Sequence, residues 1–332
     1  MVKSRKTLSV IAASAILALA GCTSAQETGS SNPESETSSQ SASAIKTIED
    51  NFGSHEVKTP AESIVVTDNR SFEILDAWGV NLAAAPKQLI PSTIENYKNN
   101  DEIVDIGNHK EPDLEAMAAV NPDLIINGQR FSQYYEDIKK LNPDATLLEF
   151  EPRDGEPVDE ELKRQTLALG EVFEKQDEAQ KLVDDFDKAK ARAKEAYDSE
   201  QTVMAVNVSG GEIGYVAPEK GRFFGPIFEW IGMKPALEVE NASDDHQGDD
   251  ISVEAIAESN PDWVLVLDRD AAVKSDATPA EQVLKDNAAL QNVSAFKDNH
   301  LVFAPGDTYT NENIITYTET LNSMADEFEK AK

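Results

Sequence analysis

One stretch occurs twice in this chain, and it constrains the fold more than any other feature. LEAMAAVNPDLIINGQR spans residues 114–130 and VEAIAESNPDWVLVLDR spans 253–269, with a constant offset and no gaps. Each copy follows a helix-capping residue, Asp113 or Ser252. Each pattern predicts a helix, a tight turn at Asn-Pro-Asp and a short buried strand that ends at an arginine. A repeat at so long a period predicts two similar α/β lobes rather than a solenoid.

Size and charge narrow the class of protein. The chain has 332 residues, 40% of them hydrophobic, which suffices for one bilobed protein or two ordinary domains. Its formal net charge is −32, from 62 acidic against 30 basic residues. Such a charge repels nucleic acids and anionic lipid headgroups, so we expect no nucleic-acid partner. Solubility or a salty habitat would also account for the acidity.

The N-terminus has the pattern of an export signal. Lys3, Arg5 and Lys6 precede an apolar run over 8–19 that is too short for an ordinary membrane span. The run ends in Leu-Ala-Gly-Cys22, which resembles the lipobox of bacterial lipoproteins, and Cys22 is the only cysteine. We therefore expect a signal peptide over 1–21 and a diacyl anchor on Cys22, which would hold the protein stably on a bilayer. An ordinary secretory signal with a chance cysteine is the alternative.

The remaining chain divides into four parts. Residues 22–56 begin with a Ser-, Thr- and Glu-rich stretch and are expected to form a flexible tether. Residues 57–157 alternate predicted strands and helices as an N-terminal α/β lobe, and 201–332 do so as a C-terminal lobe. Residues 158–200 contain no proline and one glycine, and their apolar spacing predicts one long or twice-bent helical segment that connects the lobes as a stiff spine.

Three arginines are candidates for an anion pocket. In parallel α/β sheets, ligands bind beyond the carboxyl ends of the strands, and Arg130 and Arg269 follow the repeated strands there. Arg222 precedes a predicted helix of the second lobe and could be a third. A surface ion pair is the simpler explanation for any one arginine. The equivalent positions of Arg130 and Arg269 favour a shared positive cleft in an otherwise acidic protein.

His246 and Tyr309 are candidate metal ligands. His246 lies in a loop before the second repeat copy, and Tyr309 follows a predicted strand at 301–303. Imidazole and phenolate suit ferric iron, although an exposed loop histidine and a packed tyrosine are the simpler readings. No histidine shows HExxH spacing, and the aspartates around His246 lack EF-hand spacing, so zinc and calcium sites are weakly supported.

Glu115 and Glu254 occupy equivalent positions in the two repeat copies. Each falls in the first turn of its predicted helix, where a carboxylate stabilises the helix dipole by about 0.3–1 kcal/mol. That effect would explain either residue. Alternatively, both lie on the cleft side of their lobes and grip a partner with two basic pockets. No enzyme motif such as GxSxG or GxxxxGK[ST] occurs, so we expect no catalysis.

Together these features resemble the class III substrate-binding lipoproteins of ABC importers, in the ferric-siderophore and vitamin B12 group. The resemblance covers residues from about 57 to the C-terminus. The segments that carry it are EPDLEAMAAVNPDLII with its second copy, GQRFSQYYEDIKKLNP, GRFFGPIFEWIGMKPA, the loop before DISVEAI, and VLDRDAAV. Within the group, the chain is most similar to binders of ferric catecholates of the petrobactin and enterobactin type.

The resemblance implies two Rossmann-like lobes joined by a long helix, and a role for each candidate residue. Arg130, Arg222 and Arg269 would surround catecholate oxygens, while His246 and Tyr309 would reach the iron.

The resemblance also implies partners and a location. Glu115 and Glu254 would dock to arginines of the permease, which works with its ATPase. The protein would be a monomer on the extracellular face of the cell membrane, with no cofactor of its own and a ferric siderophore (Fe³⁺) as ligand. Alternatives are a haem or corrinoid receptor of the same family, or an exported enzyme or interaction protein on the same scaffold.

Overall fold

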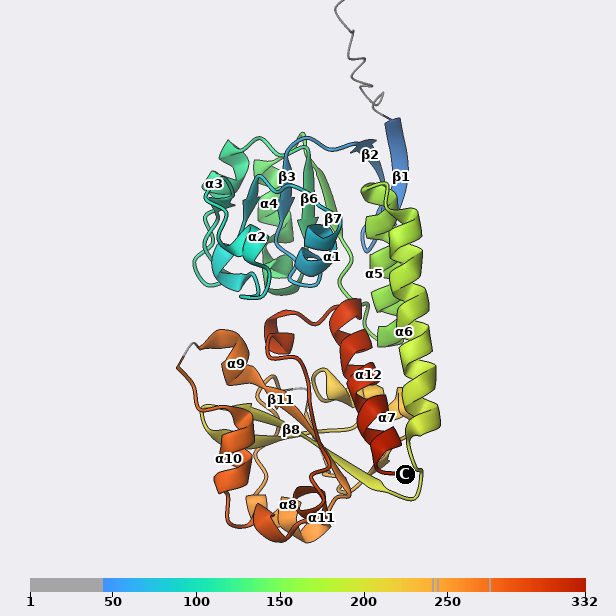
Figure 1. Ribbon diagram of the computed structural model, residues 1–332. Coiled ribbons are helices and arrows are strands. Elements are labelled where there is room, and N and C mark those ends of the chain that lie inside the picture. The colour runs from blue at the N-terminus through green and yellow to red at the C-terminus, as the bar shows by residue number, and fades with distance from the viewer. Residues whose placement is uncertain (1–43, 241, 244, 275) are drawn as a thin grey trace, which may run out of the picture. The chain divides into compact units, whose positions relative to one another are not determined.

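The computed structural model describes residues 44–240, 242–243, 245–274 and 276–332, which belong to one compact unit. They contain two five-stranded sheets and a separate hairpin (Figure 1). The first sheet is entirely parallel, with strand order β5-β4-β3-β6-β7. The second has the parallel order β10-β8-β11-β12, and β9 pairs antiparallel with β8. The predicted α/β class with two lobes is confirmed.

The strand bounds are β1 Ala44–Asp50, β2 Gly53–Thr59, β3 Ile64–Val66, β4 Ala84–Ala85, β5 Val104–Asp105, β6 Leu124–Asn127, β7 Thr146–Glu149, β8 Thr202–Ser209, β9 Glu212–Val216, β10 Lys234–Pro235, β11 Trp263–Asp268 and β12 Leu301–Phe303. The α-helices are α1 Phe72–Ala77, α2 Glu95–Lys98, α3 Leu114–Ala119, α4 Tyr135–Leu141, α5 Val158–Val172, α6 Gln176–Ala196, α7 Phe224–Ile231, α8 Val253–Ser259, α9 Arg269–Val273, α10 Ala280–Asp286, α11 Ser294–Lys297 and α12 Ile314–Lys330. Short 3₁₀ helices are η1 Lys87–Leu89, η2 Gln129–Tyr134, η3 Leu290–Asn292 and η4 Thr308–Thr310.

The repeated stretch forms the predicted helix, turn and strand in both lobes, as α3–β6 and α8–β11. Asn121 and Asn260 both have left-handed backbones, with φ of 48° and 44°, a conformation that asparagine tolerates better than most residues. The repeated aspartate, Asp123 or Asp262, accepts hydrogen bonds from backbone N–H groups where the neighbouring strand begins. The repeat therefore specifies both the turn and the hydrogen bonds that join the turn to the adjacent strand.

The expected tether over 22–56 is wrong for its described part. Residues 44–50 and 53–59 pair as the antiparallel hairpin β1–β2. Ile48 and Val57 point into the main hydrophobic core, while most other residues of the two strands are polar. The signal peptide, Cys22 and the rest of the expected tether lie outside the described residues.

The expected connecting helix over 158–200 is instead two helices, α5 and α6. Residues 173–175 interrupt it, and Glu174 adopts a positive φ of 57°. Gly170 lies at the crossing, where a Cβ atom would come 2.5 Å from the Cβ of Ala179. The absence of that side chain allows α5 and α6 to pack closely as an antiparallel pair.

Helix α6 packs along α12, and this contact joins the two sheets into one core (Figure 1). The buried face of α6 is rich in small residues, including Ala189, Ala193 and Ala196, which permit a close approach. One cluster of buried apolar side chains runs from the hairpin through one face of the first sheet, α5, α6 and α12 to one face of the second sheet. The opposite faces of the two sheets have separate clusters.

The loop before α12 also bonds to the first lobe. Asn311 and Asn313 donate to the same carboxylate oxygen of Glu73, at 2.9 and 2.8 Å. Asn69 donates to the carbonyl oxygen of Thr310 at 3.1 Å. These bonds connect residues about 240 positions apart in sequence and hold a loop of the second lobe against the first.

In the described part of the chain, no helix has the length and apolar character needed to span a bilayer.

Glu149, at the end of β7, is a buried acid with a shifted pKa. Its Oε2 accepts a hydrogen bond from Asn127 Nδ2 at 2.6 Å, and the residue is 6% exposed. Burial raises the pKa from 4.5 to about 7; the Asn127 bond opposes this shift, and the nearby carboxylates of Glu151, Asp68 and Asp50 add to it. The folded protein therefore retains a proton that the unfolded chain loses near pH 4.5.

The raised pKa of Glu149 predicts that the free energy of unfolding depends on pH. Between about pH 4.5 and 7, Glu149 should lower the free energy of unfolding as pH rises, by up to about 1.4 kcal/mol per pH unit. Above pH 7 its contribution should be constant. Glu149→Gln should flatten this part of the profile in urea unfolding at pH 5, 6, 7 and 8. The control is Glu136→Gln, an exposed position on α4; equal slopes in the two variants would contradict the assignment.

Candidate functional site

A cleft of about 1020 Å³ lies where strands of both sheets end. The first lobe contributes Arg70 after β3, Arg130 after β6 and Glu151 after β7. The second contributes Arg269 after β11 and Tyr309 after β12. The carboxyl ends of both parallel sheets thus supply the walls, as expected for a ligand site in α/β proteins.

The three arginines singled out from the sequence converge on one tyrosine ring. The guanidinium carbons of Arg222, Arg269 and Arg130 lie 4.0, 4.9 and 5.9 Å from the ring centroid of Tyr309. Tyr309 is 5% exposed and belongs to η4. Attraction between each cation and the ring face offsets part of the repulsion among the three positive charges. The structure thus brings together four of the predicted site residues.

Arg130 and Arg269 each have a guanidinium nitrogen that can still donate a hydrogen bond to a ligand. Among the residues that the structure describes, Arg130 Nη1 and Arg269 Nε are buried without a hydrogen-bond partner. Burial, with the nearby charge of Arg222, lowers the pKa of Arg130. Arg269 Nη1 donates to Ser209 Oγ at 3.3 Å and lies 3.6 Å from Asp270 Oδ1. Buried donors without partners are costly, so the two arginines are suited to an anionic acceptor in the cleft.

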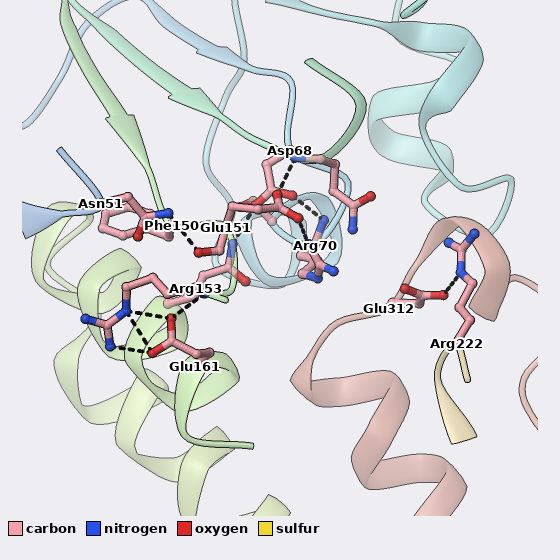
Figure 2. A network of polar contacts seen from close by, with 12 residues as sticks. Asn51, Asp68, Arg70, Phe150, Glu151, Arg153, Glu161, Arg222 and Glu312 are labelled. Carbon is pink, nitrogen blue, oxygen red and sulfur yellow. Dashed lines mark hydrogen bonds and ion pairs between the residues drawn. The ribbon is translucent and has the colours of Figure 1, made fainter. Parts of the chain in front are cut away.

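Arg222 is held more firmly than the other two. Its Nε donates to the carboxylate of Glu312, and its Nη2 donates to the carbonyl oxygen of Tyr309 at 2.8 Å. Burial alone would lower the pKa of Arg222, but the Glu312 carboxylate outweighs it and the pKa is raised. Arg222 therefore lies in the cleft with a resident counter-ion (Figure 2).

Arg70 is a fourth cleft arginine that the sequence reasoning missed. Its Nη1 pairs with Glu151 Oε1 at 2.8 Å, and Asp68 lies beside it (Figure 2). Burial and the charge of Glu151 raise the pKa of Asp68 to about 6, against the effect of Arg70. Gln165 of α5 donates to Asp68, which ties the cleft to the connecting helices. Arg70 follows the apolar strand in SIVVTDNR, as Arg130 follows its own strand. The same rule that selected Arg130 could therefore have identified Arg70 from the sequence.

The cleft is positively charged although the protein is acidic. Of its described lining residues, six are basic, namely Arg70, Lys98, Lys110, Arg130, Arg222 and Arg269, and two are acidic, Glu151 and Glu312. The ammonium group of Lys98 already binds the backbone, since its Nζ donates to the carbonyl oxygens of residues 87, 88 and 90. The excess of positive charge selects anionic ligands over neutral or cationic ones.

Two histidines line the same cleft. The side chain of His246 is 54% exposed, and its Nδ1 lies 3.9 Å from Asp245 Oδ1. His109, which the sequence reasoning did not select, has a buried Nδ1 without a partner among the described residues. Burial, Arg130 and Lys110 lower its pKa, which favours the neutral imidazole. Over the described ranges, no cluster of three or more His, Cys, Asp or Glu side chains could hold a metal ion.

Glu115 and Glu254 lie outside the residues that line the cleft. Both are exposed, in the first turns of α3 and α8, which are capped by the side chains of Asp113 and Ser252. The two glutamates therefore occupy equivalent positions at the starts of their helices, as the repeat predicts. Their docking role stays a prediction.

Comparisons with known proteins agree with this geometry. The family model described as periplasmic binding protein matches residues 64–308. The ferric-anguibactin-binding protein FatB of Vibrio anguillarum is 30% identical over 263 residues, which span 79% of this chain and 80% of that protein. The petrobactin-binding protein YclQ of Bacillus subtilis is 29% identical over 286 residues, or 85% of this chain and 86% of that protein.

Solved structures show the same fold. The crystal structure of the petrobactin-binding protein has a TM-score of 0.71 at 26% identity and covers 86% of this chain and 99% of its own. The periplasmic catecholate-siderophore binding protein VctP of Vibrio cholerae has a TM-score of 0.71 at 25% identity, covering 87% and 100%. The family match extends over most of the chain and includes both sheets. The chain therefore belongs to the periplasmic binding protein family, whose members bind solutes.

Proposed function

We propose that this protein is the solute-binding component of an ABC importer and captures a ferric siderophore of the catecholate type. The observation that carries the proposal is the convergence of Arg130, Arg222 and Arg269 on Tyr309 in a cleft with an excess of basic residues. The relatives named for petrobactin and catecholate siderophores support the same ligand class.

The chemistry of the ligand matches the cleft. A ferric catecholate complex carries net negative charge, with its oxygens spread around the iron. Guanidinium groups bind such oxygens through charge-assisted hydrogen bonds, each contributing about 1.5–3 kcal/mol. Arg130 and Arg269 have buried nitrogens that such oxygens would satisfy. The positive cleft of about 1020 Å³ is in the upper range of sizes for small-molecule sites.

Iron in a tetradentate complex has two open coordination positions. His246 lines the cleft from a loop of the second lobe, and Tyr309 lies among the arginines. An imidazole and a phenolate would complete the coordination of the cargo iron. A hexadentate siderophore would need neither.

We further propose that Cys22 carries a lipid anchor at the outer face of the cell membrane, and that the protein acts as a monomer without catalysis. In this proposal Glu115 and Glu254 bind basic residues of the permease, and the exposure of each on the first turn of its helix supports that role. The relatives that are named as lipoproteins support the anchor.

A panel of ligands tests the proposal. Titration with ferric catecholates, ferric hydroxamates, ferric citrate, haem and cobalamin, followed by intrinsic fluorescence quenching and checked by calorimetry, should show preference for ferric catecholates. Arg130→Ala and Arg269→Ala should each weaken that binding by roughly ten- to a hundredfold, because each removes a charge-assisted contact.

Arg192→Ala is the matched control, since Arg192 pairs with Asp326 and Glu329 on helix surfaces and does not line the cleft. Thermal unfolding should confirm that all three variants fold. A preference for haem or cobalamin, or unchanged affinity in both cleft variants, would overturn the proposal.

The iron-ligand role of His246 has a spectroscopic test. With a tetradentate ferric bis-catecholate, His246→Ala should shift the visible charge-transfer band of the bound complex, because water would replace the imidazole. With a hexadentate tris-catecholate, whose iron has no open position, the band should not move. An identical spectrum in wild type and variant for the tetradentate complex would remove His246 from the iron.

If Glu115 and Glu254 dock to the permease, their substitution should affect siderophore uptake but not siderophore binding. Glu115→Ala combined with Glu254→Ala should leave ferric-siderophore affinity unchanged and strongly reduce uptake into cells, because the permease loses two charged contacts. Glu258→Ala is the control, an exposed acid on α8 one turn beyond Glu254. Normal uptake by the double variant would exclude the role.

A further inference from the structure

Glu312 is a fixed negative charge inside a cleft that otherwise selects anions. It is 8% exposed, lines the cleft and pairs with Arg222 Nε. We propose that Glu312 is a specificity-determining residue that limits the negative charge of the ferric complex that the cleft accepts. This inference rests on the proposed function and deepens it, because it concerns which ferric catecholates bind well.

The carboxylate is held in place by its surroundings. Glu312 directly precedes Asn313, whose Oδ1 caps α12 by accepting from the backbone N–H groups of Ile315 and Thr316, at 2.7 and 3.1 Å. The positive end of this 17-residue helix favours a nearby anion. Asn313 also donates to Glu73 of the first lobe, so the loop cannot move freely away from the cleft.

Glu312 makes the three arginines around Tyr309 unequal. Arg222 is neutralised by Glu312 and also donates to a backbone carbonyl. Arg130 and Arg269 retain buried nitrogens without partners among the described residues. The three arginines and the one carboxylate therefore present about two net positive charges around the ring, where three would stand without Glu312.

Glu151, the second carboxylate of the cleft, has a different setting. Its side chain pairs with Arg70 (Figure 2) and accepts from the backbone N–H of Gln129 at 2.5 Å. Its carbonyl oxygen accepts from Asn51 and Arg164. Substitution there would disturb the first lobe. In the described structure the Glu312 side chain has one hydrogen-bond partner, Arg222, so it can be changed with less disturbance.

The charge of a catecholate complex follows from its composition. Fe³⁺ with two doubly deprotonated catechols carries −1, and with three it carries −3. The Coulomb repulsion from Glu312 is proportional to the ligand charge. Removing that charge should therefore strengthen binding of a −3 complex by the cube of the factor found for a −1 complex.

Glu312→Gln is the test variant, because its amide oxygen can still accept from Arg222 Nε. Its affinity relative to wild type would be measured by fluorescence quenching for three complexes. These are a ferric bis-catecholate (−1), a tris-catecholate of titanium(IV) (−2) and the same tris-catecholate of iron(III) (−3). The two tris-catecholates share ligand and shape, so they separate charge from size. The two tris-catecholates are hexadentate and take no ligand from the protein, so if the −2 complex gains about ninefold, the −3 complex should gain about 27-fold. The bis-catecholate should gain about threefold if Tyr309 stays neutral and about ninefold if Tyr309 binds the iron as a phenolate.

Glu327→Gln is the matched control, since it removes the same charge from a half-buried position of α12 outside the cleft, paired with Lys330. Beyond about 8 Å at physiological salt its charge is screened, so all three affinities should stay at wild-type values. Equal gains for the three complexes, or losses for all three, would overturn the inference, because Glu312 would then only position Arg222. If wild type binds none of the catecholates, the proposed function fails and the inference fails with it.

Discussion

The packing of α6 against α12 is the contact on which the rest of the molecule depends. It merges one face of each sheet into a single apolar core that also includes the hairpin and α5. Burial of that core opposes separation of the two lobes. Loops that follow the strands of both sheets can therefore form the walls of one cleft, and the Glu73 bonds to Asn311 and Asn313 add a polar tie beside it.

The cleft concentrates positive charge in a protein with a net charge of −32. Placing several guanidinium groups together in a partly buried site is unfavourable, and three devices lessen the cost. Glu151 and Glu312 pair with Arg70 and Arg222, and the ring of Tyr309 faces three of the arginines. The remaining buried donors on Arg130 and Arg269 are the groups that an anionic ligand would satisfy.

Local patterns in the sequence predicted much of the fold and part of the site. The repeated Asn-Pro-Asp turn and the apolar runs beside it determine helix and strand within a few residues, so both copies were identified. Arg130 and Arg269 were found because each directly follows such a strand. The hairpin at 44–59 was missed because few of its residues are apolar, and its order depends on packing Ile48 and Val57 into a core built from distant segments.

The sequence by itself determined the two α/β lobes, the helical character of the segment between them and the position of arginines at strand ends, because each is set by short-range spacing. Only the tertiary structure decided that the connector is two helices, that Arg70 joins the cleft, and that Glu312 neutralises Arg222. Arg70 and Glu151 are 81 positions apart, and Arg222 and Glu312 are 90 apart. No local pattern encodes such pairs, since electrostatic partners are chosen by proximity after the core has formed.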